Sequence, residues 1–184
     1  AGTRGTFNAV AGLVLRRIRY DATGGFSATG LVNGLAALGV AIEVEDCDFF
    51  DTAVAKLRQG MLYSGPAYVM RRCLFYGLQE AVYTSASGGA KVFASKFINC
   101  SVPVGPILSG QTASHLDGCS VIYSGGLTRL VKAGTIRNCA GVNLAAGGGN
   151  YGFESITSQD YNFAFGLAPG DAFVGAGIGG NCQA

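Results

Sequence analysis

Charged side chains are scarce in this chain of 184 residues, because aspartate, glutamate, lysine and arginine together make up only 13% of it. Tryptophan is absent and histidine occurs once. The net charge of +2 comes from scattered lysines and arginines and one local run at Arg16, Arg17 and Arg19. Without a basic stripe interleaved with aromatic residues, the sequence predicts no nucleic-acid partner. The arginine run is expected at an exposed strand or helix end.

Long hydrophobic runs are also lacking, although hydrophobic residues make up 49% of the chain. The apolar stretches are too short and too interrupted for a membrane span. The N-terminal segment AGTRGTFNAVAGLVLRR carries its charges after the apolar part, unlike a secretion signal. We therefore expect no membrane span, and a chain processed or trimmed from something longer.

The six cysteines form no CxxC pair and have no histidine nearby, which argues against a zinc module. They are Cys47, Cys73, Cys100, Cys119, Cys139 and Cys182. No cofactor and no metal site are expected from this spacing.

Short segments of related pattern recur along the chain. They are EDCDFFD (45–51), RRCLFYG (71–77), ASKFINC (94–100), DGCSVIY (117–123), RNCAGVN (137–143) and SQDYNFA (158–164). Counted from the cysteine-like position, they place Cys47, Cys73, Lys96, Cys119, Cys139 and Gln159 in equivalent positions, with steps of 26, 23, 23, 20 and 20 residues. An additional unit is expected before them at Ile18, Arg19 and Tyr20.

Within each segment apolar side chains alternate with period two, which indicates strands. Glycine-rich connectors such as TSASGG, SGGL and AAGGGN suit the bends between them. A β-sandwich would show turn signals at shorter intervals. A parallel solenoid stacks like residues directly, about 4.8 Å apart, and we prefer it here. It predicts cysteine stacked on cysteine, and a second stack of Phe49, Phe75, Ile98 and Val121.

The motifs RNC, INC and DGC, each followed by a short strand and a glycine turn, resemble the coils of the pectate-lyase-like superfamily. This resemblance covers about residues 42–165. It implies an all-β fold, a single-stranded right-handed parallel β-helix with about six to seven coils of 20–26 residues. The expected organisation is an N-terminal cap or entry segment at 1–35, the β-helix at 36–165 and a glycine-rich C-terminal coil or tail at 166–184. The segment DATGGFSATGLVNGLAALG is expected to hold a short helix or a cap.

The stretch EVEDCDFFD gathers the acids Glu43, Glu45, Asp46, Asp48 and Asp51. Glu43 and Glu45 share a strand face about 7 Å apart, a spacing open to glycosidic-bond chemistry or to Ca²⁺. In the step of 26 residues, however, Glu45 and Asp46 fall under Arg71 and Arg72. A charge-paired exterior is the preferred interpretation, and the cation, glycan and catalytic alternatives stay open. Glu43 and Asp48, with no basic residue stacked in the next coil, are the weak catalytic candidates.

The single histidine, His115, precedes Asp117 by two residues, so a strand would aim both side chains the same way. Such a pair suits acid–base catalysis, or else an ordinary surface histidine. The aspartate sets of related lyases and the NTD, DD and GHG strings of related hydrolases are absent.

Tyrosines provide the candidate glycan-binding surface, because an exposed ring stacks on a sugar and an inward ring fills the core. The candidates are Tyr63, Tyr68, Tyr76, Tyr83 and Tyr123.

The resemblance implies two main functions. The first is a structural or receptor-binding spike-type component of a phage or similar particle, assembled as a homotrimer with other virion proteins and contacting cell-surface polysaccharide. The alternative is a polysaccharide lyase or glycoside hydrolase, and a bacterial extracellular adhesin is a further one. An extracellular or virion location is expected for all three.

Overall fold

A computed structural model describes residues 4–5, 12–21, 32–38, 41–50, 59–64, 68–78, 80–84, 90–100, 102–104, 115–123, 129–144, 151–166, 173–175 and 181–183. Within these residues every regular element is a strand and none is a helix. Each pair of neighbouring strands is parallel. The predicted all-β class is therefore confirmed.

The strands form three parallel sheets. Sheet A contains β1 (Arg4–Gly5), β4 (Val32–Leu38), β7 (Gln59–Ser64), β10 (Glu80–Thr84) and β13 (Val102–Val104). Sheet B contains β2 (Leu13–Arg16), β5 (Ile42–Glu45), β8 (Tyr68–Arg71), β11 (Ala90–Phe93), β14 (His115–Asp117), β16 (Arg129–Arg137), β18 (Tyr151–Asp160) and β20 (Phe173–Gly175). Sheet C contains β3 (Arg19–Asp21), β6 (Asp48–Phe50), β9 (Leu74–Tyr76), β12 (Lys96–Ile98), β15 (Ser120–Tyr123), β17 (Ala140–Asn143) and β19 (Phe163–Phe165).

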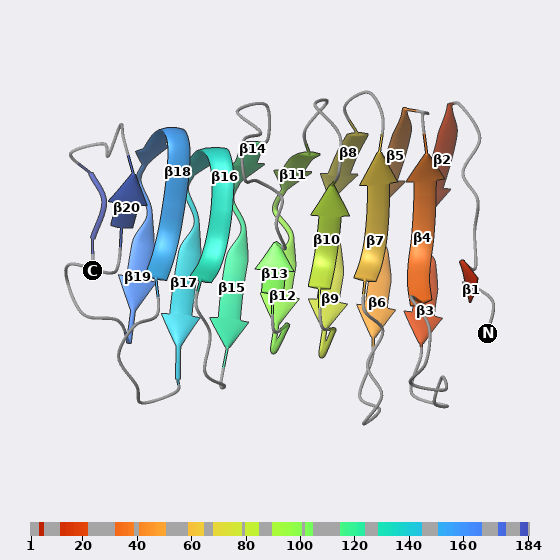
Figure 1. Ribbon diagram of the computed structural model, residues 1–184, viewed down its shortest axis with the longest axis horizontal. Helices are drawn as coiled ribbons and strands as arrows, with labels where there is room; N and C mark the ends of the chain where they lie inside the picture. Colours follow the sequence, from red (N-terminus) through yellow and green to blue (C-terminus); the bar gives the residue numbers. More distant parts are fainter. Residues whose placement is uncertain are drawn as a thin grey trace.

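The chain visits the sheets in a fixed order, and we call each passage a repeat. The first five repeats are β1–β3, β4–β6, β7–β9, β10–β12 and β13–β15; the next two are β16–β17 and β18–β19, which begin with long strands. In Figure 1 successive repeats follow one another along the long axis, from the N-terminus at one end to the C-terminus at the other. Each strand of sheet C thus pairs with the equivalent strand of the next repeat.

Strand pairing extends beyond the predicted β-helix region on its N-terminal side. The expected additional unit is present, since Tyr20 of β3 lies in register with Phe49 of β6. Residues Val32–Leu38, where a short helix or cap was expected, form strand β4.

Alternation of side chains explains the core. In β5, Ile42 and Val44 are buried while Glu43 is exposed, as expected for period two. One aromatic stack runs through the interior: the ring centroids of Phe49 and Phe75 lie 5.0 Å apart, and so do those of Phe75 and Phe97.

The next member of this stack is Phe97, not Ile98, because Phe97 pairs with Phe75 and with Val121. The predicted count began at Lys96, which is exposed, one residue past the true equivalent. Since a shift by one residue turns every side chain to the other face, that error exchanged Phe97 for Ile98.

A left-handed backbone corner separates each sheet B strand from the following sheet C strand. The corner residues are Arg17, Asp46, Arg72, Ala94, Gly118, Asn138 and Tyr161, with φ between 47° and 65°. Each inter-repeat contact at the corner has the same hydrogen bond, as when the amide of Asp46 donates to the carbonyl of Arg71 at 3.0 Å. The corner therefore fixes the register between repeats.

The residue after each corner points inward, and we call this the ladder position. Its members are Ile18, Cys47, Cys73, Ser95, Cys119, Cys139 and Asn162, aligned by the hydrogen bonds of the residues that follow them. Cys182 continues this alignment, although the residue before it, Asn181, is not a left-handed corner. The predicted stacking of Cys47 on Cys73 and of Cys119 on Cys139 is confirmed. Lys96 and Gln159 were wrong equivalents, and Ser95 and Asn162 take their places.

Ladder side chains accept hydrogen bonds from the backbone of the preceding repeat. The Cys73 amide donates to Ser95 Oγ at 3.1 Å, and the Cys139 amide donates to Asn162 Oδ1 at 3.0 Å. The amides of Cys47 and Cys119 face the sulfurs of Cys73 and Cys139 at the same place. A ladder residue therefore satisfies a buried donor as well as filling space. Cys100 is also buried but follows a different corner, at Asn99.

Candidate functional site

Charged side chains gather on the outer face of sheet B in the first three repeats. We call this group the charged patch; it consists of Arg16, Arg17, Glu43, Glu45, Asp46, Arg71 and Arg72. Register places Glu45 between Arg16 on one side and Arg71 on the other. The predicted stacking of Glu45 under Arg71 and of Asp46 under Arg72 is therefore confirmed, and Arg16, Arg17 and Arg19 are exposed as expected.

Glu45 is the centre of the charged patch, with a side chain that is only 17% exposed. Arg16 Nε donates to Glu45 Oε2 at 2.9 Å. Arg71 Nη1 lies 3.7 Å from Oε1, and Arg72 Nη2 lies 4.0 Å from Oε2. Both carboxylate oxygens thus face guanidinium groups, so the Glu45 side chain is held by ion pairs to both neighbouring repeats.

Asp46 and Arg72 form the tightest pair of the patch. Arg72 Nε donates to Asp46 Oδ1 at 2.7 Å and Arg72 Nη2 donates to Oδ2 at 3.0 Å, in the two-pronged geometry that arginine and carboxylate favour. The hydrogen bonds from Arg72 hold the pKa of Asp46 below its ordinary value. Since the pair lies in solvent, its main effect is to fix the register of neighbouring repeats.

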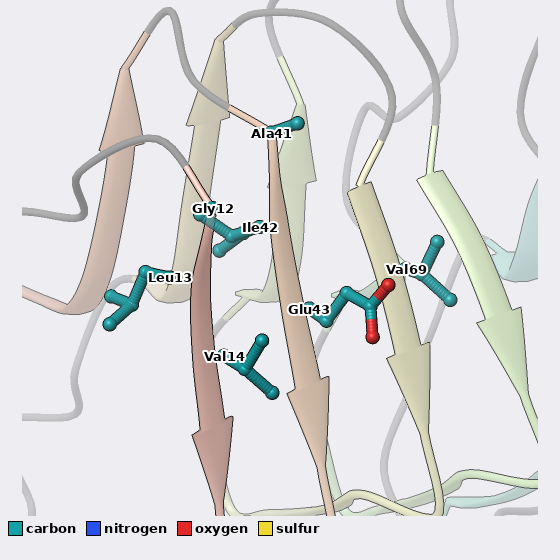
Figure 2. A pocket seen from close by; sticks show the side chains of 7 residues that line it. All are labelled: Gly12, Leu13, Val14, Ala41, Ile42, Glu43 and Val69. Atoms are coloured by element: carbon teal, nitrogen blue, oxygen red, sulfur yellow. The ribbon is translucent and has the colours of Figure 1, made fainter.

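Glu43 lines a small, largely apolar pocket of about 200 Å³ formed by residues of β2, β5 and β8. Figure 2 shows its side chain extending from β5 toward Val69, with Val14 on its other side. The carboxylate is not isolated, because Arg71 Nη1 lies 3.9 Å from Glu43 Oε2. The expectation that no basic residue stacks on it in register holds, since its partner in β8 is Val69, but Arg71 reaches it diagonally.

Asp48 projects from the outer face of sheet C, away from Glu43. Its register partners are Arg19 in the preceding repeat and Leu74 in the next. None of the ion pairs found among the described side chains includes Asp48. The two weak catalytic candidates therefore lie on different sheets.

His115 and Asp117 share the outer face of β14, as predicted. His115 Nε2 lies 3.8 Å from Asp117 Oδ2, and both side chains are about one-third exposed. The other oxygen of Asp117 accepts a hydrogen bond from Asn138 Nδ2 at 2.7 Å. Phe93 adjoins the pair, with its ring centroid 5.8 Å from that of His115. This arrangement orients an imidazole, but no nucleophile accompanies it in the contacts of the described residues.

Tyr76 is the one candidate glycan-binding tyrosine whose side chain the structure describes. It stacks on Phe50, with ring centroids 5.4 Å apart, on the outer face of sheet C. The side chains of Tyr63, Tyr68, Tyr83 and Tyr123 lie outside the described residues, although their backbones belong to β7, β8, β10 and β15.

An apolar row on sheet C is the surface that the sequence did not reveal. It consists of Phe50, Tyr76, Ile98, Ile122, Val142 and Phe165, which are paired in register on six neighbouring strands. Phe163 and Leu144 extend the apolar surface near its C-terminal end, and Phe165 and Leu144 are 59% and 63% exposed. The alternation of inward and outward side chains along each strand could have revealed this row, once the inward residues of each segment had been assigned correctly.

Among the residues that the structure describes, no group of three or more histidine, cysteine, aspartate or glutamate side chains is placed to hold a metal ion. No helix long and apolar enough to cross a membrane is found in this part of the chain either.

Comparison with protein-family models, with curated proteins and with solved structures found no match to this chain.

Proposed function

We propose that this protein is a structural component of a spike-like fibre, folded as a right-handed parallel β-helix and assembled as a homotrimer. The visit of the chain to three parallel sheets in fixed order supports the β-helix. So do the recurring left-handed corner and the inward ladder. The placement in a phage or similar particle, with an extracellular or virion location, follows from the resemblance of the RNC and DGC motifs to spike proteins.

The observation that carries this proposal is the apolar row on sheet C. Its six strands span about 24 Å at 4.8 Å per strand. Contiguous apolar surface of this kind is uncommon on a monomer and is typical of an interaction site. A row that repeats every 4.8 Å is matched best by a surface with the same spacing, and a second copy of the chain supplies one.

Charge distribution supports the same assignment of faces. The charged patch covers the outer face of sheet B in the first three repeats, so solvent is the natural environment of that part of the face. The apolar row has no ion pair of its own; Arg19 lies 4.4 Å over the ring of Phe50 at its N-terminal end. In the proposed trimer the sheet C faces pack around the central axis and sheet B faces outward, where surface glycans or other virion proteins would bind.

Sedimentation equilibrium of the purified protein tests the proposal. The expected result is a trimer that dissociates when Ile122→Asp and Phe165→Asp are combined, because a carboxylate in each apolar position opposes packing. Lys91→Asp, which introduces the same carboxylate on the outer face of sheet B, is the matched control and should remain trimeric. A wild-type chain that is monomeric at high concentration would overturn the proposal.

A polysaccharide-active enzyme is the second candidate, favoured by the His115–Asp117 pair and by Glu43 beside its pocket. Incubation of folded protein with a panel of acidic and neutral polysaccharides tests it. New reducing ends or unsaturated products that disappear in His115→Gln would support this function. A panel without any product would remove it.

A further inference from the structure

Four of the cysteines aligned along the ladder occur as two adjacent pairs. Cys47 and Cys73 follow Ile18 and precede Ser95, and Cys119 and Cys139 lie between Ser95 and Asn162. Each of these four cysteines therefore has one cysteine, and only one, as a neighbour in the ladder. The second pair is in closer contact, because its two thiols interact directly with each other.

The geometry of the second pair is set by the backbone. The amide of Ala140 donates to the carbonyl of Cys119 at 2.9 Å, and the same bond joins every repeat at this level. Strands joined in this way lie about 4.8 Å apart, which falls within the range of Cα separations that a disulfide spans. The parallel stacking of the two residues also directs both side chains to the same side of the backbone.

Both sulfurs lie inside the molecule, against backbone carbonyls. Cys119 Sγ is 3.5 Å from the carbonyl of Val92, and Cys139 Sγ is 3.0 Å from the carbonyl of Arg137. The interaction with the Cys119 thiol, together with burial, raises the pKa of the Cys139 thiol. Both side chains are buried, so a dissolved disulfide cannot reach the native pair, and chemistry has to occur while the chain is still folding or open.

We propose that Cys119 and Cys139 form a disulfide when the chain folds in the presence of a low-molecular-weight disulfide such as oxidised glutathione. The thiolate of one cysteine attacks the glutathione disulfide, which releases one reduced glutathione and leaves a mixed disulfide. The thiolate of the other cysteine displaces the second glutathione. Two S–H bonds and one S–S bond break, one S–S bond forms, and the two protons and two electrons pass to glutathione.

The crosslink would join the fifth repeat to the sixth at the level of β15 and β17. It closes a short loop, which restricts the unfolded chain, and leaves the hydrogen bonds of the corner in place. The fifth and sixth repeats would thus be joined by a covalent bond in addition to packing and hydrogen bonds in an oxidising compartment, and by packing and hydrogen bonds alone in a reducing one. This inference is independent of the proposed function, since a monomer can carry the crosslink equally well.

The test is refolding of the full chain from urea with oxidised and reduced glutathione, followed by blocking of free thiols and digestion with trypsin. Arg129, Lys132 and Arg137 are cleavage sites between the two cysteines, so that only a disulfide keeps the fragments together. We expect one linked pair of fragments that separates on reduction, and a higher urea midpoint for the oxidised protein than for the reduced protein.

Single variants identify the partners. Cys119→Ser and Cys139→Ser introduce the residue that Ser95 already provides at the ladder position, and each should fold, lose the linked fragments and lose the shift in midpoint. Cys182→Ser is the matched control and should keep both. Fragments that separate without reductant in the wild type, or a link that survives Cys139→Ser, would overturn the proposal.

Discussion

Ala94 and Gly118 occupy the same left-handed corner in neighbouring repeats, and the amide of Ala94 donates to the carbonyl of Asp117, next to Gly118, at 2.9 Å. Ala94 thus carries a side chain in a left-handed conformation, with φ of 47°, that disfavours one. Gly118 is the residue type that suits this conformation.

Exchanging these two residue types should have opposite effects. Ala94→Gly relieves the left-handed strain, and Gly118→Ala introduces it, each by about 1 kcal/mol in the free energy of unfolding. A Cβ on Gly118 would meet Ala94 no closer than 3.8 Å, so the cost comes from the backbone and not from a clash. Urea denaturation of both variants measures it, and two changes of the same sign would contradict the assignment of the corner.

Ser95 provides a test of the ladder as a hydrogen-bonding device. Its Oγ accepts from the Cys73 amide and donates to the carbonyl of Phe93 at 2.9 Å. Ser95→Ala leaves the buried amide without an acceptor and should lower the free energy of unfolding by about 1–3 kcal/mol. Ser95→Cys, the matched control, retains an acceptor of the kind the other repeats use and should cost less. Equal losses of stability in both variants would mean that the hydrogen-bond acceptor at position 95 is not what stabilises the fold.

Alkaline pH should destabilise the protein through Cys73. Burial raises the pKa of this thiol from 9.0 to about 12. Its contribution to stability is therefore complete below pH 9 and is lost as the pH rises toward 12, because only the unfolded state ionises in that interval. Urea midpoints between pH 8 and pH 11 measure the slope, in buffers with a reducing agent. Cys73→Ser should flatten this slope, and an unchanged slope would exclude Cys73 as its source.

Acidic pH should act on the pair of Asp46 and Arg72. The pKa of Asp46 is lowered in the folded state, so its contribution is present above the ordinary value of 3.8 and is lost as the pH falls below it. Asp46→Asn should give a slightly lower urea midpoint than the wild type at pH 7 and the same midpoint at strongly acidic pH. Asp48→Asn, which removes an acid that has no arginine within ion-pair distance among the described side chains, should change neither value.

The charge pairing of the patch was predictable because a single offset of 26 residues aligns the charged residues of the second repeat with those of the third. Glu45 with Arg71, and Asp46 with Arg72, require only that offset. The following repeat was harder to align. ASKFINC carries its cysteine at a different corner, and the serine that occupies the ladder position is chosen for its hydrogen bonds, which hydrophobic periodicity does not reveal.

In the candidate site, too, some features follow from sequence spacing and others depend on details that spacing does not give. That His115 and Asp117 face the same way follows from strand alternation alone, and it was predicted. The diagonal approach of Arg71 to Glu43 depends on the conformation of a long side chain and was not. The apolar row was missed because Phe50 and Tyr76 have the composition of a core, and only the exact register shows that they face outward.

The charges of the first three repeats alternate in sign, from Arg16 and Arg17 to Glu45 and Asp46 and then to Arg71 and Arg72. If the folding chain slipped by one whole repeat, the first would lie directly against the third, and arginine would face arginine at both positions. Parallel strands of similar sequence are otherwise easily interchanged, since their backbones offer identical hydrogen bonds. The charged patch would thus discriminate against misfolded pairings while adding little to the stability of the correct one.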